Sequence, residues 1–140
     1  KGRIALLGTE ATIRSGVYEA VDTSAEIIPL AMQELINAIE AKQVPPDLLM
    51  NSLARVRATG ADTVILACTH FAHIEKEIQA SLGDKVHLIN PAHAVANDLR
   101  EKLGPMPDAR STQKFFTSGI PFKATLPSRK IHVQFFSQND

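Results

Sequence analysis

This 140-residue sequence has one cysteine, no tryptophan and no excess of charge of either sign. The single cysteine excludes an internal disulfide framework and fits a reducing compartment. Lysine plus arginine and aspartate plus glutamate both number 15, so charge predicts neither a nucleic-acid partner nor a membrane surface. No apolar run approaches the roughly 20 residues of a membrane-spanning helix. The length allows one domain, or one domain and part of another.

The sequence does not begin with methionine, and its first residues do not read as a signal peptide. Only Lys1, Gly2 and Arg3 precede the apolar segment 4–7, which reads as a strand. An opening on a buried strand is typical of the later part of a longer protein, and we expect this chain to be such a part.

Apolar runs alternate with amphipathic segments along the chain, which predicts an α/β fold with a parallel sheet and helices on both faces. Strands are expected at 4–7, 64–67, 86–89, 114–117 and 131–135. After a turn at 8–16, helices are expected from Val17, from Thr23 or Ser24 to about residue 42, and at 46–59, 73–82 and 91–103.

Two of these helices carry clear apolar faces. In the long helix, apolar residues recur at three- and four-residue spacing, and Pro29 falls near the first turn. In the helix 91–103, Asn90 is placed to cap the start, and the packed face is expected at Ala94, Val95, Leu99 and Leu103. The face of the long helix predicts packing on the sheet, and the face of 91–103 marks a second packed surface.

The stretch 63–71 is the centre of the functional argument. A buried strand ends in the polar triplet Cys68-Thr69-His70, at the carboxyl end where α/β sheets bind ligands. A thiol, a hydroxyl and an imidazole can supply a base, an anchor and a proton donor. A lone cysteine is more often an inert core residue, which is the alternative. The histidine spacing is not a recognised metal-ligand pattern, and a cysteine hydrolase lacks an identifiable third group.

The turn at 8–16 is rich in glycine and hydroxyl groups. Hydroxyls and free backbone N–H groups between a strand and a helix can hold an anion such as a carboxylate, here with Thr9, Thr12 and Ser15. The alternative is that these three residues only cap and turn the chain.

Four segments resemble one family. Cys68-Thr69-His70-Phe71, after the Gly-Ala-Asp strand start, resembles the second-cysteine motif of the glutamate racemases, in the aspartate/glutamate racemase superfamily. The segment 8–18 is similar to the loop that opens the second domain of that family. The segments 88–92 and 115–119 resemble its closing segments, in the same order. The resemblance covers nearly all of the chain.

The resemblance implies cofactor-independent racemisation of glutamate by two opposed cysteines, without a metal. One thiolate removes the α-proton and the other thiol returns a proton to the opposite face. Cys68 would be the base acting on the L enantiomer. Thr69 and His70 would hold the substrate or assist the thiol, and the substrate carboxylates would bind Thr9, Thr12 and Ser15.

The resemblance also implies a cellular setting. The expected product, D-glutamate, feeds bacterial peptidoglycan synthesis and therefore cell shape. The expected location is the bacterial cytoplasm, and the expected partners are glutamate, an N-terminal half of the same protein and a second copy in a homodimer, with neither nucleic acid nor membrane.

Several departures from the family pattern restrict what this chain can do alone. The first cysteine and the first-domain loop of the family are absent, so half of the site is missing. We therefore expect 1–88 to form most of the flavodoxin-like second domain and 89–140 to return to the first. Met32-Gln33 stands where an acidic partner of His70 is expected, and Glu34 would need a register shift. An aspartate racemase-type enzyme, a non-catalytic carboxylate-binding fragment and a cysteine hydrolase remain the alternatives.

Overall fold

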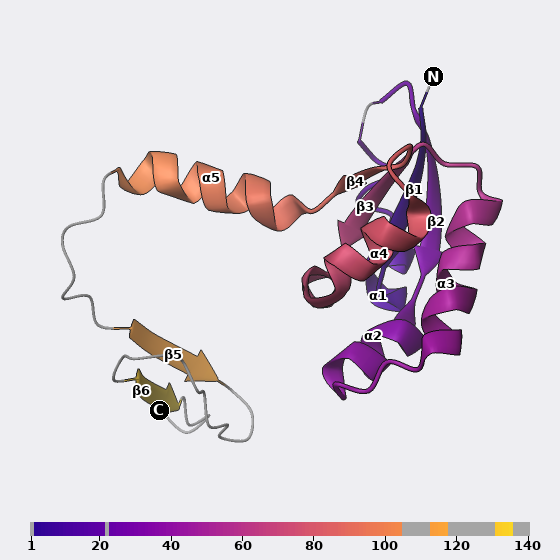
Figure 1. The fold of residues 1–140 in the computed structure, drawn as a ribbon. Helices are drawn as coiled ribbons and strands as arrows, with labels where there is room; N and C mark the ends of the chain where they lie inside the picture. The colour runs from indigo at the N-terminus through magenta and orange to yellow at the C-terminus, as the bar shows by residue number, and fades with distance from the viewer. Residues whose placement is uncertain (1, 22, 105–112, 118–130, 136–140) are drawn as a thin grey trace. The chain divides into compact units, whose positions relative to one another are not determined.

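The computed structural model describes residues 2–21, 23–104, 113–117 and 131–135 (Figure 1). The chain divides into two compact units, Lys1–Lys102 and Leu103–Asp140. The boundary expected between residues 88 and 89 concerns the domains of a longer protein and stays a prediction. Residues 118 and 119 of the last family-like segment lie outside the described residues.

A four-stranded parallel sheet forms the centre of the first unit. Its strands are β1 (Arg3–Gly8), β2 (Glu26–Ala31), β3 (Thr63–Ala67) and β4 (His87–Ile89), in the order β2-β1-β3-β4. β1 pairs with β2 on one side and with β3 on the other, and Gly8 stands beside Ala67. The predicted parallel α/β sheet is confirmed.

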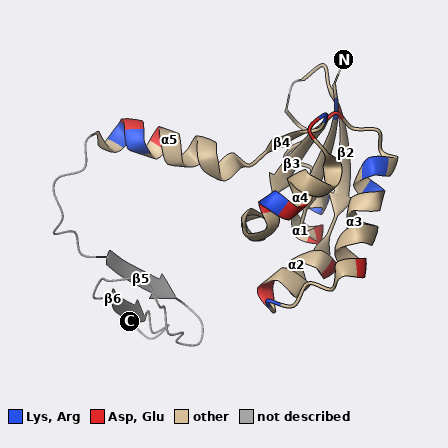
Figure 2. Ribbon diagram, in the orientation of Figure 1, with Lys and Arg blue, Asp and Glu red and all other residues tan. Residues whose placement is uncertain are grey.

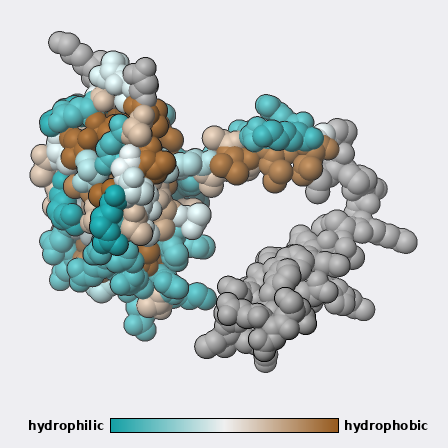
Figure 3. Space-filling view, turned by 180° about the vertical axis from the view of Figure 1, so that it is seen from behind, coloured by the Kyte–Doolittle hydropathy of each residue, from teal (hydrophilic) through white to brown (hydrophobic). Residues whose placement is uncertain are grey.

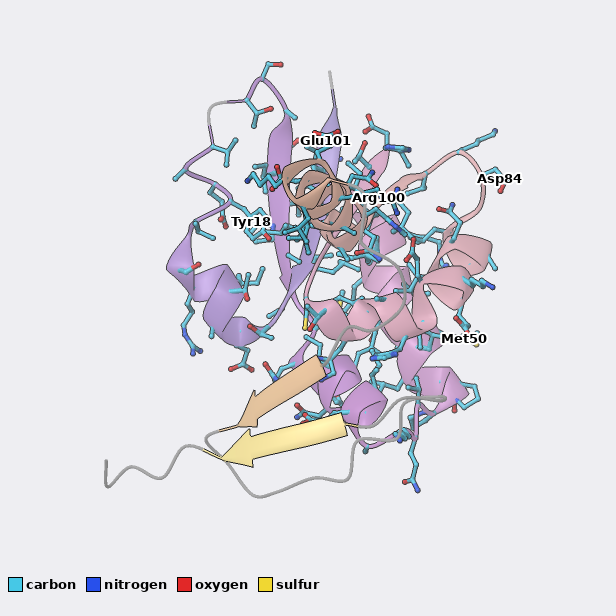
Figure 4. The ribbon with its side chains drawn as sticks, turned by 90° about the vertical axis from the view of Figure 1, so that its left-hand side faces the viewer. Tyr18, Met50, Asp84, Arg100 and Glu101 are labelled. Carbon is cyan, nitrogen blue, oxygen red and sulfur yellow. The ribbon has the colours of Figure 1, made fainter. Side chains whose placement is uncertain are left out.

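Helices lie on both faces of this sheet. The helices are α1 (Glu10–Ser15), α2 (Gln33–Glu40), α3 (Pro46–Ala58), the 3₁₀ helix η1 (Thr69–Ile74), α4 (Glu75–Leu82) and α5 (Pro91–Leu103), and of these α5 is not packed on the sheet in the described part of the chain. α1 lies on the side of the sheet opposite to α3 and α4 (Figures 1 and 4). Helices thus lie on both faces, as the alternation of strands and helices predicts, and the described core lies on the side of α3 and α4.

The main core lies between the sheet and the layer of α2, η1, α3 and α4. Alternate residues of β1 and β3 point into it, because side chains of a strand alternate between the two faces. Phe71, on η1, is 0% exposed and is the largest of the fully buried side chains. The cluster consists of Ala5, Leu7, Met32, Leu35, Ile36, Ile39, Leu53, Val56, Val64, Leu66, Phe71 and Ile78.

The long helix expected from residue 24 is wrong in its first part. Residues Glu26–Ala31 form β2, and only Gln33–Glu40 are helical. β2 is an edge strand, so Pro29, which cannot donate to a ladder, is tolerated opposite Leu6. The β-branched Ile27 and Ile28 favour a strand. The helical spacing predicted for this segment combined apolar residues of β2 with those of α2, which are two separate elements on either side of Met32.

The helix expected from Val17 is also wrong. α1 lies inside the predicted turn, at Glu10–Ser15. The Thr9 side chain caps it by accepting from the backbone N–H of Thr12, and Gly16 ends it in the left-handed conformation with φ 63°. Residues read as turn formers thus begin and end a short helix, and Val17 follows it.

α5 has the expected bounds, but its apolar face is not packed within the described residues. Asn90 Oδ1 accepts from the Ala92 N–H at 3.0 Å, as expected of a cap. Val95 is 65% exposed and Leu99 54%. Figure 3 shows α5 with a brown apolar side and a teal polar side. The packed face expected at these positions is therefore not packed within the described residues, and a partner for it in the rest of a longer protein stays a prediction.

The remaining strand predictions are confirmed. In the second unit, β5 (Gln113–Thr117) and β6 (Ile131–Phe135) pair in parallel. Over the described part of the chain, no helix combines the length and the apolar character that a membrane span requires. Figure 2 shows the acidic and basic residues interspersed over the helices.

We expect Phe71→Ala to destabilise the first unit by about 3–5 kcal/mol, because the substitution leaves a cavity where α2 and η1 meet. Urea unfolding followed by circular dichroism measures the loss. Phe71→Leu is the matched control and should cost less than about 1.5 kcal/mol if the site repacks. An Ala variant within about 0.5 kcal/mol of the parent would show that η1 is held by other contacts.

Candidate active site

The Cys68-Thr69-His70 triplet lies where the sequence places it, directly after β3. Cys68 is extended, with φ −149° and ψ 135°, and is the residue from which η1 starts. Its carbonyl oxygen accepts from the Phe71 N–H at 3.2 Å. The buried Phe71 ring therefore anchors the turn that carries the thiol and the imidazole.

The thiol and the imidazole of the triplet are in contact. The distance from Cys68 Sγ to His70 Nδ1 is 3.4 Å, within reach of a hydrogen bond involving sulfur. Cys68 is half-buried and packs against the edge of the core, so it is neither enclosed nor fully open to solvent. A proton can pass between these two side chains without movement of the backbone.

The triplet faces two different cavities. Cys68 and Thr69 line a cavity of ≈ 530 Å³, whereas His70 lines a second one on the α2 side, also of ≈ 530 Å³. The first cavity is walled mainly by apolar groups from the end of β3, the turn after α1 and the start of α5. Its other lining residues are Tyr18, Leu66, Ala67, Asn90, Pro91, Ala92, Val95, Ala96 and Leu99.

The three hydroxyl groups predicted to bind an anion follow a strand adjacent to the one that precedes the triplet. They form hydrogen bonds with one another's backbone and side chains. Thr9 follows Gly8, whose sheet neighbour is Ala67, the residue before Cys68. Thr9 Oγ1 lies 2.9 Å from Thr12 Oγ1 and accepts from the Thr12 N–H at 3.0 Å. Ser15 Oγ donates to the Thr12 carbonyl at 2.6 Å. These bonds suit a capping role, and carboxylate binding stays a prediction.

Sequence reasoning missed the contact that holds the start of α5 beside the thiol. Asn90 Nδ2 donates to Glu75 Oε2 at 2.7 Å, and His93 Nε2 lies 3.6 Å from Glu75 Oε1. Asn90 was recognisable as a cap, but its partner is 15 positions away in sequence. Tyr18, labelled in Figure 4, was also missed, because it was assigned to a helix.

Met32 occupies the place where an acidic partner of His70 was sought. It lies just after β2, is 2% exposed, and its sulfur is 3.7 Å from Arg55 Nη1. Glu34 is exposed on α2. Among the described residues, the hydrogen bond found for the His70 ring is the one to Cys68.

Comparisons with known proteins agree on one family. The model of the Asp/Glu/hydantoin racemase family matches residues 1–99. The chain is 34% identical over 129 residues to a glutamate racemase of Lysinibacillus sphaericus, covering 83% of this chain and 49% of that protein. It is 29% identical over 133 residues to a glutamate racemase of Corynebacterium diphtheriae, covering 86% and 50%.

A solved structure gives the same result. The crystal structure of glutamate racemase isoform RacE1 from Bacillus anthracis matches with a TM-score of 0.68 and 28% identity, over 86% of this chain and 50% of that one. The chain thus spans about half the length of the relatives that it matches.

We expect Asn90→Ala to loosen the start of α5 beside Cys68, because it removes both the helix cap and the bond to Glu75. Loss of such a cap costs about 1 kcal/mol. Amide hydrogen exchange should show faster exchange at Ala92 and His93, with Val64 unchanged. Asn37→Ala, on the exposed side of α2, is the matched control. Unchanged exchange at Ala92 would contradict the holding role of Asn90.

Proposed function

The chain belongs to the Asp/Glu/hydantoin racemase family, and from this premise we propose that it supplies one half of a glutamate racemase site, with Cys68 as one of two opposed thiols. The observation that carries the proposal is the position of Cys68. It follows β3 at the ligand-binding end of the sheet, lines a cavity, and touches His70.

The proposed reaction is a proton exchange at the α-carbon. Cys68, as a thiolate, takes the α-proton of L-glutamate and leaves the electron pair on carbon. A thiol on the other side of the substrate, from the other half of the protein, then delivers a proton to the opposite face. His70 Nδ1 accepts the Cys68 proton beforehand, over the 3.4 Å contact. No redox partner or cofactor is needed.

The neighbouring hydroxyl groups are proposed to hold the substrate. Thr69 lines the Cys68 cavity, whereas Thr9 is not among its lining residues and follows Gly8, the sheet neighbour of Ala67. Thr9, Thr12 and Ser15 would donate to the substrate carboxylates, exchanging their present local bonds for charge-assisted ones, which are stronger. Such fixed donors stabilise the negative charge that develops as the proton leaves.

The half-length of the chain relative to glutamate racemases supports a two-part site. The second thiol is proposed to lie in a half that corresponds to the remainder of those relatives. The complete enzyme would form a homodimer and supply D-glutamate for peptidoglycan in the bacterial cytoplasm. Choice of glutamate over aspartate is part of the proposal and rests on the relatives' names.

A non-catalytic carboxylate-binding role is the second candidate, and the buried Met32 favours it. Without a carboxylate at this position, the hydrogen bond found for the His70 ring among the described residues is the one to the thiol. An imidazole fixed by a third group is the usual arrangement in thiol catalysis.

We expect the isolated 140-residue chain to be inactive, because its one cysteine can serve only one face of the α-carbon. Circular dichroism at a wavelength where the enantiomers differ would follow D-glutamate conversion. A turnover of order 1–10³ per second, as in ordinary enzymes, would contradict the two-thiol proposal. Addition of the other half should restore activity.

In a protein that holds both halves, we expect Cys68→Ala to lower the rate of racemisation by a similar, large factor in both directions. The remaining thiol can still remove the proton of D-glutamate and return a solvent-derived one to the same face. In D₂O, nuclear magnetic resonance should show deuterium entering D-glutamate while L-glutamate stays inert.

His70→Asn is the matched variant for this experiment and should slow racemisation without abolishing it, because His70 assists the thiol and does not replace it. Unchanged racemisation by the Cys68→Ala variant would mean that Cys68 is a structural core residue and not a base. Deuterium uptake by neither enantiomer, in a folded variant, would remove the second thiol from the proposal.

A further inference from the structure

A second cavity of ≈ 530 Å³, between the end of α2 and η1, has no role in the proposed reaction. This α2–η1 cavity has an apolar wall formed by Ile39, Val44 and Ile74. None of its lining residues lines the Cys68 cavity. Its volume is in the range that holds small organic molecules in proteins.

The lysine among the lining residues of the α2–η1 cavity, Lys42, has an unusual backbone conformation. Lys42 has φ 56° and is the one non-glycine residue with positive φ in the described part of the chain. The Lys42 N–H donates to the Ile39 carbonyl and the Gln43 N–H to that of Ala38, at 2.9 and 3.0 Å. This helix-ending motif normally has glycine at the Lys42 position.

Glycine is found at the other positive-φ positions of the described chain, including Gly16 after α1 and Gly104 after α5. The sequence thus keeps a lysine where glycine would adopt the conformation more easily. Non-glycine residues held in this region are found at ligand sites more often than elsewhere. Because Lys42 also lines the cavity, its side chain is a cation available to a negatively charged ligand.

The remaining polar groups define the ligand further. His73, exposed on η1, adds a second possible hydrogen-bond donor to the lining, whereas Glu40 contributes one carboxylate. The apolar wall requires a hydrocarbon part. The chemistry that fits is a small organic anion with an apolar body.

His70 connects this cavity to the thiol. It lines the α2–η1 cavity, and its Nδ1 lies 3.4 Å from Cys68 Sγ. His70 is thus a lining residue of this cavity and a contact of the thiol at the same time. A ligand that moves the ring or changes its hydrogen bonding would therefore change the surroundings of the Cys68 thiol.

We propose that the α2–η1 cavity is a second ligand site, for a small organic anion with an apolar body, and that its occupancy changes the reactivity of Cys68 through His70. Binding at this site does not depend on racemase activity. It would regulate the thiol in any of the functions considered for the chain.

Phenylpropionate, with its neutral amide as control, is a suitable probe of the full 140-residue chain. Proton–carbon resonances of the imidazoles report occupancy. We expect saturable shifts at His70 and His73 but not at His93, and at least tenfold weaker binding of the amide. Equal binding of the two probes, no saturable shift, or shifts centred on His93 would each overturn the proposed site.

Variants distinguish this site from general adsorption. Lys42→Gly should weaken phenylpropionate binding at least fivefold without loss of fold, because glycine suits φ 56°. Glu40→Gln should strengthen binding about twofold, since it removes a like charge. Lys85→Gln, outside the cavity lining, is the matched control and should bind as the parent does. Binding by Lys42→Gly as tight as that of the parent chain would overturn the role of Lys42 in binding the anion.

The coupling to the thiol is tested by alkylation, because Cys68 is the only cysteine. Saturating phenylpropionate should change the rate of iodoacetamide reaction at Cys68 at least twofold. His70→Gln should retain binding and lose this effect. An unchanged rate in the parent chain, or a full effect in the His70 variant, would overturn the coupling. Neither readout requires racemisation, so failure here is distinguishable from failure of the proposed function.

Discussion

The parallel pairing of β1 with β3 is the constraint on which the rest of the first unit depends. Its register places Gly8 beside Ala67, so the chain leaves the sheet at Thr9 and at Cys68 from adjacent positions. The same two strands supply one side of the core, and α2, η1, α3 and α4 supply the other. Burial of Phe71 then fixes η1, and the contact between thiol and imidazole follows from the turn that η1 makes. Site geometry is thus a product of core packing.

Much of this fold could be predicted from the sequence, for identifiable reasons. β3 is a continuous apolar run between Gly60 and the polar triplet, and α3 starts at a Pro pair and ends before Gly60. Such signals are local. β2 could not be recognised, because its strand character depends on being the edge partner of β1, which allows Pro29. α1 could not be recognised either, because Thr9 and Gly16 are typical of turns as well as of helix ends.

The candidate site was predictable where its residues are adjacent and unpredictable where they are distant. The position of Cys68 and its closeness to His70 follow from the end of one strand. The separation of Thr69 and His70 into two cavities follows from a 3₁₀ turn that a helical pattern does not reveal. Contributions of Tyr18 and Asn90 depend on which segments the sheet order brings together. The exposed apolar residues of α5 include Val95 and Leu99, which also line the Cys68 cavity. This open side is where the proposed second half of the site would be needed.

The central claim is that Cys68 is one of two bases on opposite sides of the substrate, and a racemisation time course in D₂O tests it most directly. The measurement uses the unsubstituted protein with both halves and follows deuterium at the α-carbon by nuclear magnetic resonance, starting from L-glutamate. With two bases, the D-glutamate formed early carries deuterium while the remaining L-glutamate keeps its proton. Early deuterium in L-glutamate at the rate at which D-glutamate appears would indicate a single base that serves both faces, and would contradict the account.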